Sequence, residues 1–148
     1  MIPTGSIHEI LEHKGSTVWT VSPEATVFEA IQLMSEKNVG ALLVTEQGRL
    51  VSIISERDYT RKVALRGKTS KDLRVREIIP DRVLSVTPAH TIEECLRLMT
   101  ENRVRHLPVL DGDRLVGLVS IGDLVNWVIS AQSTTIRQLE TYISGCPG

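Results

Sequence analysis

The chain of 148 residues has few aromatic side chains, no excess of positive charge and no long hydrophobic run. With 3% aromatic residues and a formal net charge of −1, it offers neither a global basic field for phosphate backbones nor many rings for stacking bases. No apolar run approaches the roughly 18–20 residues that cross a bilayer, and no basic N-terminal segment precedes an apolar core. These absences argue against a dedicated nucleic-acid binder and against a membrane protein, and we expect a cytoplasmic protein.

Cysteine is scarce as well. Cys95 falls in a helical apolar pattern and Cys146 in the terminal SGCPG, without the C-x-x-C spacing of a metal site or redox pair. We therefore expect no metal site, with Cys95 as a small core residue and Cys146 as an exposed thiol. The remaining composition, 41% hydrophobic and 24% charged, is typical of one compact domain or two small packed units.

What the chain does contain is an internal repeat. Residues 21–59 align with residues 86–124 at a constant offset of 65, without a gap, and many positions are identical. The similarity extends upstream, where IHEIL at 7–11 resembles VREII at 75–79 if the first connection has three extra residues. Such slack is typical of a loop.

Each copy predicts the same order of elements. A strand near residues 18–21 precedes an amphipathic helix, which Thr26 and Glu29 open with a capping box, as Thr91 and Glu94 do in the second copy. Two apolar runs around a Gly-containing turn then predict a hairpin, and a second helix follows at about 56–65 and 121–129. The order strand-helix-strand-strand-helix indicates an α+β unit with helices on one face of a small sheet.

We expect two such units to pack sheet to sheet with pseudo-two-fold symmetry, because neither alone buries much core. The first unit, with its leading helix, is placed at residues 6–67 and the second, with the connecting segment, at 68–130. The tail, 131–148, has Ile136, Leu139 and Ile143 at helical spacing, which predicts a helix that packs on the module or on a partner chain, with core packing favoured.

Each repeat closes with an S-x-x-D motif, Ser55–Asp58 in the first copy and Ser120–Asp123 in the second. A single copy of this pattern is typical of a helix cap. The same motif at the same place in both copies also indicates a pair of binding sites, because a helix N-terminus favours anions and a carboxylate accepts hydrogen bonds from vicinal hydroxyls. The two roles are compatible, since an acidic residue in the first turn also favours the helix dipole.

With ISERDYTRK, GKTSK, NRVRHLPVL and VSIGD, the chain from Ser6 to Ile129 resembles a tandem pair of CBS domains, or Bateman module, of the stand-alone type known from bacteria and plant organelles. The resemblance implies that adenosyl ligands, usually AMP, ADP or ATP and sometimes NAD or S-adenosylmethionine, bind in clefts between the paired sheets, and that the protein is a homodimer. It further implies that the motif Asp holds the ribose hydroxyls and that the Ser lies near phosphate. No cofactor is required under this interpretation.

The residues expected to bind nucleotide come from both copies and their surroundings. In the motifs and the helices that follow, these are Ser55, Arg57, Asp58, Arg61, Lys62, Ser120, Gly122 and Asp123. Further groups suited to phosphate are Lys68, Ser70, Lys71, Arg105 and His106. Contacts to the base and its edges are expected from Thr20, Val21, Ile54, Ser85, Val86, Leu107, Pro108 and Val119.

The two copies are not equivalent in sequence. Gly117 before the second motif fits the family pattern, whereas Ser52 is its counterpart, and a side chain there narrows the approach of a ligand to backbone. Arg105 and His106 each correspond to a small residue in the first copy. We therefore expect two unequal sites.

The predicted function is that of a regulatory module without catalysis, since no nucleophile, base and orienting group occur at a signature spacing. Two alternatives stay open. One is an interaction or stress protein of the same fold, in which the S-x-x-D motifs act only as caps. The other is weak nucleic-acid binding by the basic stretch 57–76.

Overall fold

A computed structural model of the chain describes residues 5–130, so the predicted helix over Ile136, Leu139 and Ile143, and Cys146, lie outside the described residues. The first repeat forms a three-stranded sheet of β1 (Thr20–Val21), β2 (Ala41–Glu46) and β3 (Arg49–Ser55) in the order β1-β2-β3. β1 is parallel to β2, and β2 is antiparallel to β3. Gln47 and Gly48 form the hairpin turn with φ of 52° and 78°, the left-handed pair that a two-residue turn requires. The predicted hairpin is confirmed.

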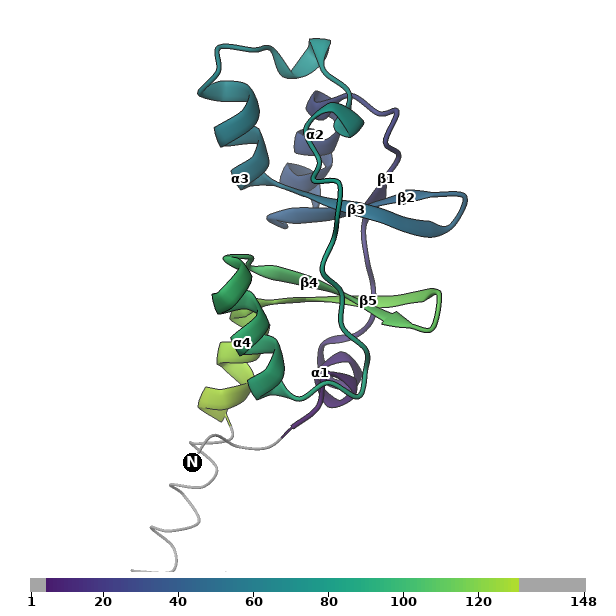
Figure 1. Ribbon diagram of the computed structural model, residues 1–148, viewed down its shortest axis with the longest axis vertical. Coiled ribbons are helices and arrows are strands. Elements are labelled where there is room, and N and C mark those ends of the chain that lie inside the picture. The colour runs from purple at the N-terminus through teal and green to yellow at the C-terminus, as the bar shows by residue number, and fades with distance from the viewer. Residues whose placement is uncertain (1–4, 131–148) are drawn as a thin grey trace, which may run out of the picture. The chain divides into compact units, whose positions relative to one another are not determined.

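Two helical segments lie on one face of this sheet (Figure 1). α2 (Val27–Lys37) begins where the Thr26 side chain accepts a hydrogen bond from the Glu29 N–H, and it ends at Asn38, whose φ is 55°. α3 (Glu56–Tyr59) continues directly into a π-helical turn, η1 (Thr60–Ala64). The second helix of the first copy is therefore confirmed at its predicted start, but its π turn was not predicted.

The apolar stripe of α2 forms the core of the first repeat. Val27, Ala30 and Met34 are buried, as their spacing predicts, against strand residues such as Leu42 and Ile54. Burial of these side chains is what fixes the face of the helix that meets the sheet.

The second repeat has the same order of elements as the first, but its sheet has one strand fewer. It contains α4 (Ile92–Asn102), β4 (His106–Asp111), β5 (Arg114–Ser120) and a helical stretch at residues 121–130. Thr91 and Glu94 make the complete predicted capping box, and Cys95 is a buried core residue as expected. The sheet has the two strands β4 and β5, and the counterpart of β1 is a single bridge at Val86.

The segment that leads each repeat pairs with the helix start of the other repeat. Ser6, just before α1 (Ile7–Lys14), bridges Thr91, while Arg74, just before the short helix η3 (Val75–Glu77), bridges Thr26. The short helix η2 (Ser70–Asp72) precedes η3 in the connecting segment. The similarity between residues 7–11 and 75–79 thus corresponds to equivalent places in the fold.

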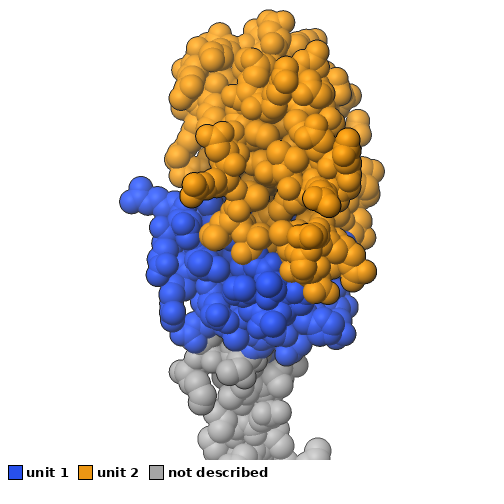
Figure 2. Space-filling view, turned by 45° about the vertical axis from the view of Figure 1, so that its right-hand side comes forward, with its two compact units in different colours: residues 1–16, 86–107, 118–148 blue, residues 17–85, 108–117 orange. Residues whose placement is uncertain are grey.

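Contacts divide the chain into two compact units (Figure 2). One takes its described residues from 1–16, 86–107 and 118–148, and the other from 17–85 and 108–117. The Ile7 N–H donates to His90 O at 2.9 Å, which joins α1 to the second repeat. The sequence-based ranges 6–67 and 68–130 stay a prediction. Among the residues described, no helix is long and apolar enough to span a membrane.

Candidate functional site

The first S-x-x-D motif lies where β3 passes into α3. Asp58 Oδ2 accepts hydrogen bonds from the Ser55 N–H at 2.9 Å and from the Ser55 hydroxyl at 3.0 Å, and the Asp58 N–H faces Ser55 Oγ at 3.3 Å. These bonds complete a capping box, so the capping interpretation is confirmed. The Glu56 N–H also donates to Gly40 O at 3.0 Å, which holds the start of α3 beside the start of β2.

A lysine accompanies this carboxylate. Lys62 Nζ lies 3.6 Å from Asp58 Oδ1 and donates to Ile78 O at 2.7 Å. The Asp58 side chain is 21% exposed and the Lys62 side chain 36%, so the pair is held by the fold and is still reachable from solvent. A carboxylate and an ammonium at one helix start are suited to a ligand that carries both hydroxyls and an anion.

The second motif has the same backbone arrangement. The Ser120 N–H donates to Asp123 Oδ2 at 2.8 Å, and the Asp123 N–H donates to Ser120 Oγ at 3.1 Å. The Ile121 N–H donates to Arg105 O at 2.8 Å, which matches the bond between Glu56 and Gly40 in the first copy. The backbone of Arg105 therefore lies directly beside the second motif.

The cation at the second motif comes from a different element. Lys14, in the last turn of α1, donates from Nζ to Asp123 Oδ2 at 2.7 Å and to Leu118 O at 2.9 Å. Burial disfavours the ionised form of Asp123, but the hydrogen bonds from Lys14 and Ser120, with the charge of Lys14, outweigh it and hold the pKa of this carboxyl below its usual value. Sequence reasoning missed Lys14, since nothing in its spacing connects it with a residue 109 positions away.

The structure brings together part of the predicted set. Ser55, Asp58 and Lys62 share contacts in the first copy, as do Ser120 and Asp123 in the second. Lys71 has another contact, because its Nζ lies 4.8 Å from the centroid of the Phe28 ring. The other polar candidates lie in exposed or half-buried positions: Thr20, Arg57, Arg61, Lys68, Ser70, Ser85, Arg105, His106 and Gly122.

Most of the apolar candidates are core residues. Val21 alone among them is half-buried, at the end of β1. The remainder are buried: Ile54, Val86, Leu107, Pro108 and Val119. Their role as walls for a base stays a prediction.

Ser52 is fully buried, and its hydroxyl makes a hydrogen bond inside the compact unit that contains it. It donates to Pro80 O at 3.1 Å, in the segment that follows η3. The serine that replaces the family glycine in the first copy thus joins β3 to the connecting segment.

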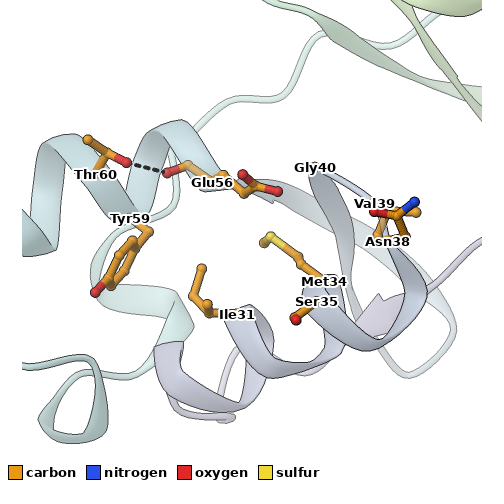
Figure 3. A pocket seen from close by; sticks show the side chains of 9 residues that line it. All are labelled: Ile31, Met34, Ser35, Asn38, Val39, Gly40, Glu56, Tyr59 and Thr60. Carbon is orange, nitrogen blue, oxygen red and sulfur yellow. Dashed lines mark hydrogen bonds between the residues drawn. The ribbon is translucent and has the colours of Figure 1, made fainter.

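A cavity of about 670 Å³ lies between α2 and α3 (Figure 3). Ile31 and Met34 from α2 face Tyr59 and Glu56 from α3 across it, and the Thr60 hydroxyl donates to Glu56 O at 3.1 Å at its edge. None of the residues predicted to bind nucleotide lines this cavity. It is distinct from the carboxylates of the two motifs.

Two α+β units, each closed by a capped S-x-x-D motif, define a tandem-repeat module, and comparison with known proteins identifies its family. The CBS domain family matches residues 15–65 and 75–130, so the chain belongs to the CBS-domain family. The chain is 37% identical over 150 residues to the Arabidopsis thaliana "CBS domain-containing protein CBSX3, mitochondrial", covering 95% of this chain and 72% of that one.

Solved structures agree with this assignment. A protein with CBS domains from Burkholderia ambifaria MC40-6 has 48% identity and a TM-score of 0.83, covering 86% of this chain and 96% of that one. The hexameric CBS-CP12 protein from bloom-forming cyanobacteria has 34% identity and a TM-score of 0.73, covering 82% of this chain and 69% of that one. CBS domains are commonly regulatory or signalling modules, and the family binds adenine nucleotides in general. Stand-alone members are typically regulatory and not catalytic.

Proposed function

We propose that this protein is a regulatory module without catalysis that binds adenine nucleotides, AMP, ADP, ATP or NAD(H), at its two S-x-x-D motifs. One observation carries the proposal: each motif presents a capped, partly exposed aspartate with a lysine beside it. The Asp58 and Asp123 side chains are 21% and 24% exposed, respectively. Structural capping alone does not require a cation at both carboxylates.

The chemistry of each motif suits a ribonucleotide. The carboxylate accepts hydrogen bonds from two vicinal hydroxyls, and the lysine offsets the charge of a phosphate. A hydrogen bond to a charged group contributes about 1.5–3 kcal/mol, whereas micromolar affinity needs about 8 kcal/mol. The motif therefore orients the ribose, and further groups of the predicted set supply the remaining affinity.

Calorimetry tests this function. AMP, ATP and NADH are titrated into the wild-type protein and into Asp58→Ala and Asp123→Ala variants. We expect each substitution to weaken its own site about 10- to 100-fold, since a charged hydrogen-bond acceptor is removed. Asp113→Ala, an exposed aspartate in the β4–β5 turn, is the matched control and keeps both sites. Absence of heat with all three nucleotides in the wild type refutes the proposal.

A second candidate is a nucleotide-independent interaction protein, and the complete capping bonds of both motifs favour it. Under this function, removal of Asp123 lowers the free energy of unfolding by about 0.5–2 kcal/mol, as for other caps, but nucleotide does not change thermal stability. Under the first function, nucleotide raises the melting temperature of the wild type and loses that effect in the variants. Thermal unfolding with and without AMP separates the two.

We also propose a cytoplasmic homodimer. Ile121, Val125 and Ile129 lie four residues apart in the helical stretch 121–130 and are 41%, 42% and 55% exposed, so they form an apolar stripe. A second copy of the chain would cover this stripe. Sedimentation velocity is expected to give a dimer for the wild type and a monomer for Val125→Glu. A hexamer, the state of the cyanobacterial CBS-CP12 protein, or an unchanged species in Val125→Glu would contradict this assembly.

A further inference from the structure

Lys14 is hydrogen-bonded to the second motif from a different element of the chain. Its ammonium group reaches across from the end of α1 and makes two bonds, one to Asp123 Oδ2 and one to Leu118 O, at 2.7 Å and 2.9 Å. The Lys14 side chain is 36% exposed and the Asp123 side chain 24%, so solvent reaches both groups. The bond to Leu118 O, just before the motif, fixes the ammonium group in place independently of the carboxylate.

The two copies provide their lysine from different elements. In the first copy Lys62 follows the motif in the same helical segment and is joined to Ile78 O at 2.7 Å. Its counterpart in the second copy is Trp127, which has no charge, and Lys14 of α1 takes over the pairing. In both copies the lysine therefore has the same two kinds of partner, the motif carboxylate and one backbone carbonyl.

The lysines differ in the carboxylate oxygen that they approach. In the second copy, the Ser120 N–H and Lys14 both bind Oδ2 of Asp123, and neither bond uses Oδ1. In the first copy, both bonds from Ser55 go to Oδ2 of Asp58, and Lys62 lies nearest to Oδ1. A hydroxyl that approaches Oδ1 of Asp58 therefore meets the oxygen nearest to Lys62, whereas in the second copy Lys14 bonds the other oxygen, Oδ2 of Asp123.

We propose that Lys14 is a positioning residue of the second motif: it holds Asp123 by Oδ2 and so presents Oδ1 to the vicinal hydroxyls of a ribonucleotide. This inference rests on the proposed nucleotide binding and deepens it. The second motif is then the site that selects for a ribose diol, and the first, where Lys62 competes for Oδ1, selects for it less. The ligand class is a ribonucleotide with free 2′- and 3′-hydroxyls.

The test isolates the second site by working in the full chain with Asp58→Ala. Calorimetry compares AMP with 2′,3′-dideoxy-AMP in this background and after adding Lys14→Met, Lys14→Arg or Glu12→Gln. Glu12 is an exposed residue of α1 that pairs with His8 at 2.9 Å, so it is the matched control. In the Asp58→Ala protein we expect AMP to bind about 10- to 100-fold more tightly than 2′,3′-dideoxy-AMP, which is the range for hydrogen bonds to a charged acceptor.

With Lys14→Met the preference for AMP over its dideoxy analogue is expected to fall to about threefold or less. Lys14→Arg, which keeps a cationic donor, is expected to retain most of it, and Glu12→Gln all of it. A purely structural role would lower the affinities for both ligands equally and leave their ratio unchanged, which would overturn the inference. Tighter AMP binding in Lys14→Met would also overturn it, because Lys14 would then block the site.

The reverse experiment uses Asp123→Ala to isolate the first site. There, Lys62→Met is expected to increase or preserve the preference for the diol, since it removes the group beside Oδ1. A loss of preference equal to that of Lys14→Met would overturn the proposed difference between the sites. If the wild type binds none of the nucleotides, the proposed function fails and this inference with it, whereas binding with an unchanged ratio overturns the inference alone.

Discussion

Burial should make Cys95 almost unreactive in the folded protein. The thiol lies in α4 with 0% of its surface exposed. Burial, with a smaller contribution from the neighbouring Glu94 carboxylate, raises the pKa of Cys95 from 9.0 to about 11. The thiolate is the reactive form, so near pH 8 this shift alone reduces the reactive fraction about a hundredfold. Labelling of the native protein is then controlled by opening of the unit that contains α4.

The magnitude follows from the stability of that unit. If opening costs about 5 kcal/mol, the low end for small domains, labelling is slowed by a factor of several thousand relative to the unfolded chain. A chain with Cys146→Ser leaves Cys95 as the only thiol of the two in the sequence. Its reaction with a chromogenic disulfide at pH 8 is followed in buffer and in increasing urea, with Cys95→Ser as the matched control that retains only Cys146.

We expect labelling of Cys95 to be slow in buffer and to accelerate with urea in parallel with loss of helical signal. Rapid labelling in buffer, at a rate comparable to that in strong denaturant, would refute both the burial of the Cys95 thiol and its raised pKa. Slow labelling that does not accelerate when the helices unfold would refute the link between opening and reactivity. The first result tests whether Cys95 is buried, and the second tests whether its labelling depends on opening of the unit.

Three further predictions concern stability. Ser52→Ala removes the hydroxyl that donates to Pro80 O at 3.1 Å and is expected to lower the free energy of unfolding by about 1 kcal/mol, measured by urea titration. Gly5→Ala places a Cβ 2.6 Å from Trp127 Nε1, and the resulting overpacking should lower the urea midpoint by the equivalent of about 1–2 kcal/mol, whereas an unchanged midpoint would contradict the contact. Because the pKa of Asp123 is depressed below 3.8, its contribution to stability is present above that pH and lost as pH falls through the folded pKa, so Asp123→Asn should flatten the acid limb of the stability profile.

Local signals in the sequence predicted the elements well, because each has a short-range cause. The capping box at Thr91 and Glu94 opens α4 as expected, and the Gly-containing turn at Gly48 joins β2 and β3 as expected. The S-x-x-D bonds were also predictable, since they connect groups three residues apart. These contacts depend on spacing along the chain, and spacing is what a sequence displays.

Features that depend on tertiary contacts were not predicted. The π turn after Tyr59 changes the phase of the helix just after the first motif, and no residue type signals it. The pairing of α1 with the second repeat, through Ile7 and His90, connects segments that are far apart in sequence. The pair of Lys14 and Asp123 follows from that docking, so it could be found only once the partner of α1 was known.

The two copies use different lysines, Lys62 and Lys14, because a packed tryptophan occupies the position of Lys62 in the second copy. At the position of Lys62, the second copy has Trp127, whose indole lies edge-on to His13 at 6.5 Å between ring centroids and against Gly5. The tryptophan thus belongs to the contact between the motif helix and the segment containing α1. Because this position holds a tryptophan, the motif helix has no cation there. The contact with Trp127 holds α1 close, and α1 provides Lys14 to the carboxylate. The tryptophan at this position in the second copy therefore goes with a cation from another element, so that Lys14 bonds Oδ2 of Asp123, whereas Lys62 lies nearest to Oδ1 of Asp58.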